Sequence, residues 1–153
     1  MIYTFENEQF IKSDIDSVWN YFSNPKHINL LTPTEMHFRT LTTNLPEQIH
    51  INLIISYWVS PLFHIPLKWK TKIISVEKNK SFIDIQIKGP YKKWHHLHTF
   101  EKVENGVLMK DIITYELPFG RLGDFVHRIV VKKKIDQLFE FRTKQIQKHF
   151  ENE

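Results

Sequence analysis

The spacing of apolar residues divides the chain into a strand, a helical stretch, a long region of strands and a final helix. Residues 3–11 are rich in aromatic and β-branched side chains, which predicts a first strand. The next apolar residues recur at helical spacing: Ile15, Val18, Trp19 and Phe22. Pro25 ends this helix, because proline lacks the backbone N–H that a helix interior needs.

Two short helices are therefore predicted after the first strand. Ser13 with Asp16 three residues later is similar to a capping box with Asp in place of the usual Glu, so Ser13 is the expected N-cap. Asn24 and Pro25 are typical of the cap and the first position of a second helix, which should end before Pro33.

From about Met36 to Leu117, apolar residues alternate with polar ones, as in strands that are buried on one face. One alternating set comprises Ile49, Ile51, Leu53, Ile55 and Tyr57, and another comprises Leu67, Trp69, Thr71 and Ile73. Further strands are predicted over residues 81–88, 94–103 and 107–117. With the first strand included, the pattern predicts an antiparallel sheet of about seven strands.

Asn105-Gly106 is a strong signal for a two-residue hairpin turn, and it sets a register for the last two strands. The expected opposite pairs are then Glu104 with Val107, Glu101 with Lys110, and His95 with Glu116. The pairs of Glu101 with Lys110 and of His95 with Glu116 are complementary, which favours this register.

A long helix is predicted from Asp124, its expected N-cap, to about Phe150, with a bend near Lys132. Its main apolar stripe comprises Val131, Ile135, Leu138, Arg142, Ile146 and Phe150. A helix with one apolar face must lie against a partner, and the sheet is the only large one. The predicted fold class is α+β: a curved antiparallel sheet around a long C-terminal helix, formed by residues 1–153 as a single domain.

The hairpin register also places two histidines, an aspartate and a tyrosine on one face. The opposite pairs on this face are Phe100 with Asp111, His98 with Ile113, His96 with Tyr115, and Trp94 with Leu117. The face is rich in aromatic residues, so we assign it to the interior. Unpaired buried polar groups cost roughly 1–3 kcal/mol each, so these side chains should pair with one another, with water or with a ligand. Arg142 also points inward in this scheme and needs a carboxylate or an anionic ligand group.

The polar cluster has three interpretations. His96, His98 and Asp111 are candidate catalytic acid–base residues, with Asp111 orienting a histidine. Two imidazoles and a carboxylate are also ligands for zinc or iron, but His-x-His is a common chance pattern, and we predict no metal. In the third interpretation these residues are only core or surface polarity. The sequence permits two registers for residues 89–93, so Asp84 and Gln86 face either side.

Composition argues against several classes of protein. The net charge of +4 arises from dispersed charges, apart from Lys132–Lys134, which argues against a nucleic-acid partner. The absence of cysteine excludes disulfides and thiolate metal sites. No apolar run approaches the roughly 20 residues of a membrane span, and the first residues lack signal-peptide features. We therefore expect a cytoplasmic protein without stable membrane insertion. The lysine run is either a solvated helix surface or a contact with an acidic membrane surface.

One stretch resembles a known superfamily. The run Phe82-x-Asp84-x-Gln86-x-x-Gly89-Pro90-x-x-x-Trp94-x-His96-x-His98-x-Phe100 is similar to a branch of the SRPBCC, or START-like, superfamily that is related to polyketide cyclases and is Bet v 1-like. Weaker similarity lies in Leu31-Thr32-Pro33, in Asp111-x-x-x-Tyr115-x-Leu117-Pro118-Phe119-Gly120 and in Phe139-x-Phe141-Arg142. The resemblance implies a helix-grip fold with an internal cavity. It implies no particular reaction, because members bind lipids, hormones or polyketides and only some are enzymes.

We therefore expect a binding or carrier domain for a small, mostly apolar molecule, without a cofactor. The expected ligand-binding residues are Tyr57, Trp69, Trp94, His96, His98, Phe100, Asp111, Tyr115 and Arg142. One alternative is an enzyme of cyclase, dehydratase or hydrolase type that uses His96, His98 and Asp111. Another is a scaffold whose interior is filled by its own aromatic side chains.

Overall fold

A computed structural model describes residues 1–61 and 63–152. The strands are β1 (Ile2–Ile11), β2 (Arg39–Thr40), β3 (Ile54–Val59), β4 (Leu67–Glu77), β5 (Ser81–Lys88), β6 (Lys93–Val103) and β7 (Gly106–Glu116). The helices are α1 (Ile15–Ser23), the short 3-10 helices η1 (Pro25–Asn29) and η2 (Thr34–Met36), α2 (Gly120–Val126), the π-helical turn η3 (His127–Val131) and α3 (Lys132–Glu151).

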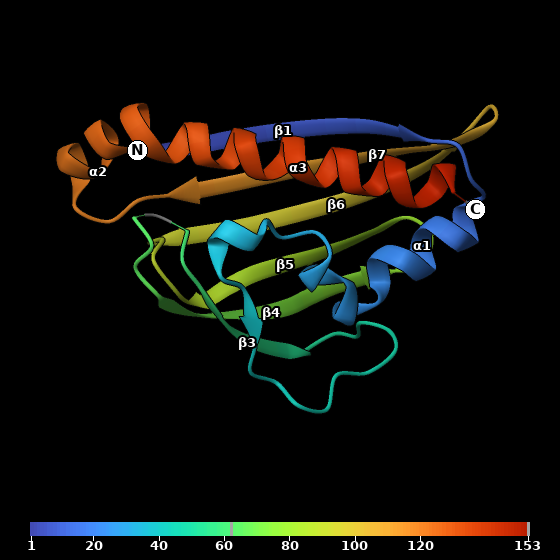
Figure 1. The fold of residues 1–153 in the computed structure, drawn as a ribbon, viewed down its shortest axis with the longest axis horizontal. Helices are drawn as coiled ribbons and strands as arrows, with labels where there is room; N and C mark the ends of the chain where they lie inside the picture. Colours follow the sequence, from blue (N-terminus) through green and yellow to red (C-terminus); the bar gives the residue numbers. More distant parts are fainter. Residues whose placement is uncertain (62, 153) are drawn as a thin grey trace.

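The strands form one antiparallel sheet in the order β1-β7-β6-β5-β4-β3-β2. Figure 1 shows the sheet curving around α3, which runs along the β1–β7 side, while α1 and the 3-10 helices lie in front of β5 and β4. The predicted α+β helix-grip architecture, with seven strands and a long C-terminal helix, is confirmed.

The start of α1 differs from the prediction by one residue. Asp14, and not Ser13, is the N-cap: its carboxylate accepts hydrogen bonds from the Ser17 backbone N–H (2.9 Å) and the Ser17 hydroxyl (2.6 Å). A carboxylate at this position satisfies an unpaired helix N–H and faces the positive end of the helix dipole. The predicted cap of the next helix is confirmed, because the Asn24 side chain accepts from the Lys26 N–H and Pro25 begins η1.

The alternating pattern from residue 49 onward predicts a strand that is longer than the observed β3. Only residues from Ile54 are in β3, and Asn52 has a left-handed φ of 69°. Ile49 and Leu53 are buried, but Ile51 is 54% exposed. The alternation of apolar residues here therefore comes from a turn whose two ends are buried, and not from a strand. The Ile49 N–H donates to the Ser23 carbonyl at the end of α1, and the Asn52 N–H donates to Ile73 in β4.

The β6–β7 hairpin turns one residue earlier than predicted, at Glu104-Asn105, and Gly106 already belongs to β7. The register prediction was therefore wrong by two positions. The observed opposite pairs are Glu101 with Leu108, His95 with Thr114, His98 with Asp111, His96 with Ile113, Phe100 with Met109, and Trp94 with Tyr115. Because side chains alternate with a period of two, this even shift leaves every residue on its predicted face.

The physical reason for the earlier turn is the close approach of β1 to Gly106. A Cβ atom at this position would lie 2.3 Å from the Ile11 carbonyl oxygen, so only glycine fits in the strand beside it. Asn105 takes the left-handed position of the turn instead, with φ 65°.

The C-terminal helix begins at Gly120, before the predicted cap Asp124. The Asp124 carboxylate instead accepts a hydrogen bond from the Tyr3 hydroxyl (2.8 Å) and lies 3.5 Å from the N-terminal amine. Next to Lys132, where a bend was predicted, the helix contains the π-helical turn η3. Ile135, Phe139 and Ile146 of α3 are buried against the sheet.

Candidate functional site

A cavity of about 500 Å³ lies between the concave face of the sheet, α3 and the segment that contains η1 and η2. Its size falls in the range of roughly 300–1,000 Å³ that is typical of small-molecule sites. The expected alternative of an interior filled by its own aromatic residues is not what the structure shows.

Three of the predicted aromatic residues line this cavity: Tyr57, Trp69 and Trp94. The Trp69 and Trp94 rings meet edge to face with centroids 5.4 Å apart, and the Tyr57 ring stacks on Trp69 at 6.1 Å. The Tyr57 hydroxyl lies 3.0 Å from the Thr71 hydroxyl, which satisfies it inside the wall. Burial raises the pKa of Tyr57 well above its usual range, so this hydroxyl stays protonated.

Phe100 and Tyr115 are not among the lining residues, which corrects their predicted role. Phe100 packs against Trp19 of α1, with ring centroids 5.6 Å apart. The Tyr115 hydroxyl lies 2.8 Å from His127 Nε2, and burial raises the pKa of Tyr115 to about 12. Both residues are on the predicted face of the sheet, but α1 covers one end of that face and the π-helical turn covers the other, so the cavity lies between them.

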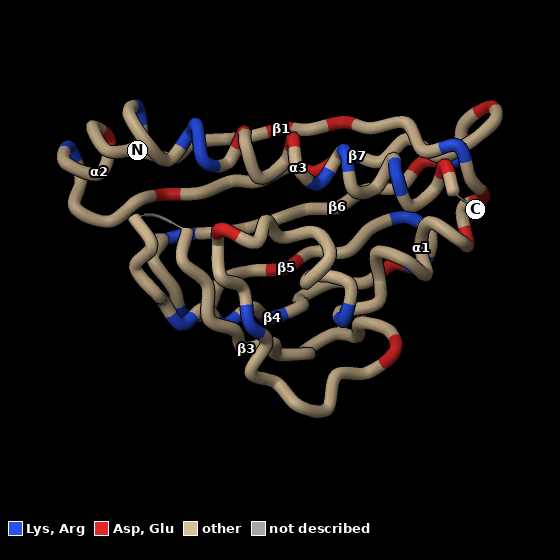
Figure 2. The backbone as a smooth tube through the Cα atoms, in the orientation of Figure 1, with Lys and Arg blue, Asp and Glu red and all other residues tan. Residues whose placement is uncertain are grey.

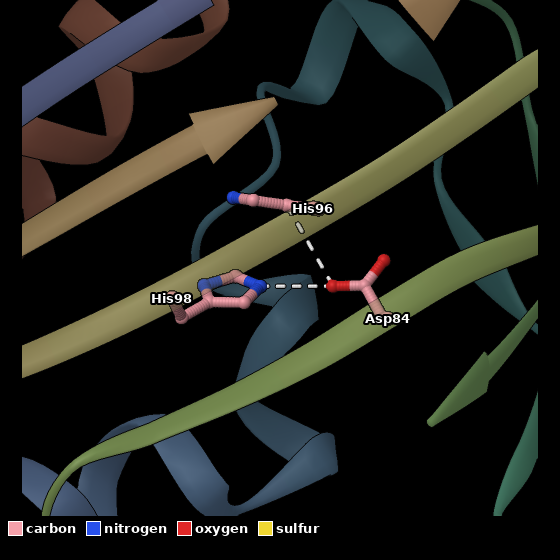
Figure 3. Close-up of side chains that lie close together, drawn as sticks. All are labelled: Asp84, His96 and His98. Atoms are coloured by element: carbon pink, nitrogen blue, oxygen red, sulfur yellow. Dashed lines mark hydrogen bonds and ion pairs between the residues drawn. The ribbon is translucent and has the colours of Figure 1, made fainter. Parts of the chain in front are cut away.

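The floor of the cavity carries a group of four ionisable side chains, hereafter the His–Asp quartet: Asp84 of β5, His96 and His98 of β6, and Asp111 of β7. His98 Nε2 is 2.8 Å from Asp84 Oδ2, and His98 Nδ1 is 3.0 Å from Asp111 Oδ1. His96 Nε2 is 2.8 Å from Asp111 Oδ1, and His96 Nδ1 is 3.6 Å from Asp84 Oδ2. Each imidazole therefore lies between the same two carboxylates, as Figure 3 shows for Asp84.

The quartet has two layers relative to the cavity. Asp84, His96 and His98 line it, whereas Asp111 is buried behind the two imidazoles and does not. The predicted inward position of Asp111 is thus correct, but a molecule in the cavity contacts the histidines and Asp84 first. The two rings are also close to each other, with centroids 3.7 Å apart.

Protonation differs between the two histidines. Burial disfavours the charged form of His98, but hydrogen bonds to Asp111 and Asp84 outweigh this, so the pKa of His98 is raised. For His96, burial and the neighbouring His98 charge prevail over the bond to Asp111, and the pKa is lowered. Burial opposes ionisation of both aspartates, but the histidine contacts prevail and lower the pKa of Asp84 and of Asp111. When the quartet carries a proton on one imidazole, His98 therefore holds it in preference to His96.

Arg142 supplies the second positive charge near the quartet. It lines the cavity, and its Nε donates to the Leu31 carbonyl oxygen at 2.9 Å, with the guanidinium 5.1 Å from the centre of the Phe139 ring. No carboxylate of the described residues lies within ion-pairing distance of it, so of the two partners expected for Arg142, a carboxylate or an anionic ligand group, the carboxylate is not in place. Burial lowers the pKa of Arg142, and the charges of Asp111 and Asp84 oppose that shift. The guanidinium and the His98 imidazolium together balance the two carboxylates.

Asp84 is the main site residue that sequence reasoning left undecided. Ile83, Ile85 and Ile87 had the appearance of the buried set, yet Ile87 is 46% exposed and the inward face carries Phe82 and Asp84. The signal that settles the register is Gln86.

Gln86 fixes the β5–β6 connection by bonding to the backbone across it. Its side-chain amide donates to the Tyr91 carbonyl (2.7 Å) and accepts from the Tyr91 N–H (3.2 Å). The β5–β6 ladder ends at Ile85 opposite His95, just before this amide, and within that ladder Asp84 lies opposite His96.

The arrangement supports two kinds of chemistry. A side chain that holds a proton between two carboxylates can donate to, or accept from, a polar atom in the cavity. Asp84, His96 and His98 also bring one ligand atom each within 4.8 Å of one another, which is a donor set for a divalent cation. In that set Asp84 replaces Asp111, which the sequence had suggested as the carboxylate.

Comparison with known proteins gives matches in structure only: no family model and no curated protein matches the sequence. The fold is similar to Ara h 8.0201, with a TM-score of 0.67 and 14% identity over the whole of both chains. It is similar to ginseng major latex-like protein 151 from Panax ginseng, with a TM-score of 0.70 and 15% identity over 97% of each chain. A protein from Chromobacterium violaceum has a TM-score of 0.71 and 9% identity over 97% of each chain.

These similarities establish the fold class. The chain has the Bet v 1-like helix-grip fold that the sequence resemblance implied. Among the described residues, no helix is long and apolar enough to cross a membrane.

Proposed function

We propose that the chain binds and carries a small, largely apolar molecule whose polar group contacts the His–Asp quartet. The observation that carries the proposal is a cavity of about 500 Å³ with Tyr57, Trp69 and Trp94 in its wall and His98 and Asp84 on its floor. An apolar cavity with a few convergent polar groups fixes the orientation of a ligand without needing catalysis. The Bet v 1-like fold supports the same function class.

The charge balance restricts the polar group of the ligand. When His98 is protonated, the two carboxylates are balanced by one imidazolium and one guanidinium, and the charges around the floor of the cavity cancel. A buried unpaired charge is costly, so a charged ligand group would upset this balance. We therefore infer an uncharged polar group, such as a hydroxyl or a carbonyl.

Catalysis by proton transfer is the second candidate function, and the contact between His98 and Asp84 at the cavity surface favours it. The reaction class would be a cyclisation, dehydration or hydrolysis with an imidazole as acid or base. Turnover of an aromatic polyketide-type substrate, abolished in His98→Gln, would establish this function over simple carriage.

Ligand binding can be tested in two ways. Native mass spectrometry of the purified chain should show a small molecule that is lost on denaturation. Nile red, an uncharged apolar dye, should bind and quench the emission of Trp69 and Trp94, which line the cavity. His98→Ala should weaken dye binding about tenfold, the effect of one lost hydrogen bond that involves a charged group. Absence of both a co-purifying molecule and dye binding would overturn the proposal.

A matched control separates the site from general effects on the fold. His95 is the neighbouring histidine on β6 but lies on the opposite face of the sheet, so His95→Ala should leave dye affinity unchanged. Circular dichroism must show that both variants are folded, and His98→Gln replaces His98→Ala if the smaller side chain prevents folding. Equal affinity in all variants would mean that His98 is only a polar core residue.

A further inference from the structure

Large apolar side chains are exposed along α2 and the π-helical turn, where a folded chain would ordinarily bury them. This set, hereafter the α2 apolar face, comprises Phe119 (81% exposed), Leu122 (64%), Phe125 (60%) and Ile129 (57%). Their spacing of three or four residues places them on one side of the helix, opposite the side that buries Gly123, His127 and Val131. Exposed apolar residues that form a contiguous patch mark an interaction surface, whereas scattered ones do not.

Two of the exposed aromatic residues at this end have a strained backbone. Phe119 has φ 69°, and Phe63 in the β3–β4 connection has φ 52° and is 69% exposed. Left-handed backbone is unfavourable for residues with bulky side chains, and neither ring gains burial in return. Strained backbone of this kind is concentrated at functional sites. There the strained conformation holds a side chain in the position that its function requires.

Positive charge surrounds the apolar face. Between Leu117 and Ile135 the chain has five basic residues, Arg121, Arg128, Lys132, Lys133 and Lys134, and the only acidic one is Asp124. The Asp124 carboxylate is engaged by Tyr3 and by the N-terminal amine. All five basic side chains belong to exposed residues, and Figure 2 shows several of them along α2 and the start of α3.

This surface lies beside the cavity. Val131 and Lys134, which follow the α2 apolar face, line the cavity together with Phe63 and His64 of the β3–β4 connection. Figure 1 shows α2 and that connection at the same end of the molecule, with the N-terminus next to α2. Exposed Met1 and Ile2 add further apolar surface at this end.

We propose that the α2 apolar face and Phe63 dock on a bilayer surface that contains anionic lipid, so that the cavity exchanges its ligand with the membrane. Apolar side chains next to Lys and Arg are the arrangement of elements that lie in the membrane interface: the apolar groups enter the acyl boundary and the cations stay with the headgroups. A second copy of this chain fits the surface less well, because pairing two such faces would bring together two clusters that each contain five basic residues and one acidic residue.

Vesicle co-sedimentation tests this proposal directly. The full chain should bind vesicles of phosphatidylcholine with phosphatidylglycerol and bind at least about tenfold more weakly to phosphatidylcholine alone, since each basic residue near an anionic surface contributes on the order of a few-fold in affinity. Phe119→Ser combined with Phe125→Ser should reduce binding to the anionic vesicles about tenfold or more. Lys132→Glu with Lys133→Glu should do the same, and raised salt should weaken wild-type binding.

The control is Ile51→Ser, which removes a side chain of similar exposure from the turn before β3. This variant should bind like the wild type, and all variants should bind Nile red unchanged, which separates docking from ligand binding. Equal binding to neutral and anionic vesicles, or no binding to either, would overturn the proposal. Loss of a dimer in Phe119→Ser with Phe125→Ser, in the absence of vesicle binding, would assign the face to a second copy instead.

Discussion

At the scale of single residues, the chemistry of the cavity depends on how protons are shared in the His–Asp quartet. His98 contacts both carboxylates at 3.0 Å or less, whereas His96 has one short contact, with Asp111, and one longer one. This asymmetry makes His98 the better place for the proton. A buried ion group of this kind is costly to break, because removal of one partner leaves an unpaired charge.

We predict that the two histidines titrate on opposite sides of the ordinary histidine pKa. In an NMR titration of the imidazole resonances, His98 should keep its proton above pH 6.5, roughly the unperturbed value, and His96 should stay neutral below it. Coincident titration of both rings at the unperturbed value would contradict the proposed proton arrangement.

The shift of His98 also predicts how stability depends on pH. Because its folded-state pKa is raised, the stabilisation from His98 is fully present below about pH 6.5 and is lost as pH rises through the folded-state value. His98→Gln should lower the free energy of unfolding at pH 6 by about 3–5 kcal/mol, since it leaves the carboxylates without their cation. The difference between variant and wild type should shrink at higher pH, as urea unfolding at several pH values would show. A difference in the free energy of unfolding that does not change with pH would contradict this prediction.

At the scale of elements, the hairpin shows what sequence patterns can and cannot predict. Alternation placed the quartet histidines and Asp111 on the correct face, because strand periodicity is a local property. The turn position was wrong, because the preference of Asn-Gly for a two-residue turn was overruled by the approach of Ile11 to Gly106, a contact between distant parts of the chain. In the same way, the register that places Asp84 inward occurs together with the bonds from Gln86 to Tyr91, which depend on a loop conformation.

Gly106 should therefore tolerate no side chain. Gly106→Ala places a Cβ 2.3 Å from the Ile11 carbonyl and 2.7 Å from the Phe10 ring, so the β1–β7 pairing must shift. We expect a loss of about 1–3 kcal/mol in the free energy of unfolding, the usual cost of overpacking. Asn105→Gly is the control, because it relieves the left-handed backbone without adding atoms and should change stability by less than about 1 kcal/mol. Similar values for the two variants would contradict this account.

At the scale of the whole molecule, the cavity exists because several separate helical elements, and not one continuous layer, cover the concave face of the sheet. The sequence predicted the layers, but it assigned Phe100 and Tyr115 to the cavity, since periodicity does not say where along a strand each helix lies. The segment with η1 and η2 forms the remaining wall, and Leu31, Met36 and Phe38 from it line the cavity. A side-chain hydrogen bond from Arg142 to Leu31 joins this wall to α3.

That bond predicts how the wall is held closed. Arg142→Lys removes the planar guanidinium that reaches Leu31 and packs on Phe139, so hydrogen–deuterium exchange over residues 28–38 should become faster. The expected loss of stability is about 1–2 kcal/mol. Lys144→Gln, at an exposed position on the same helix, should leave exchange in this segment unchanged. Unchanged exchange in Arg142→Lys would mean that the wall is held by its apolar contacts alone.

The pairing of β1 with β7 has a consequence for how the chain is made. Ile2 lies opposite Glu116, and β7 is the sheet strand that comes last in the sequence, so β1 has no sheet partner until β7 has been synthesised. Contacts that join distant parts of a chain form slowly, because a large loop must close before they contribute. During synthesis β1 therefore remains an unpaired strand, with Tyr3 and Phe5 near its start and four consecutive polar residues, 6–9, in its middle. Until β7 forms, the backbone N–H and C=O groups of β1 are free to pair with a neighbouring copy, so β1 is a segment that a chaperone would protect during translation.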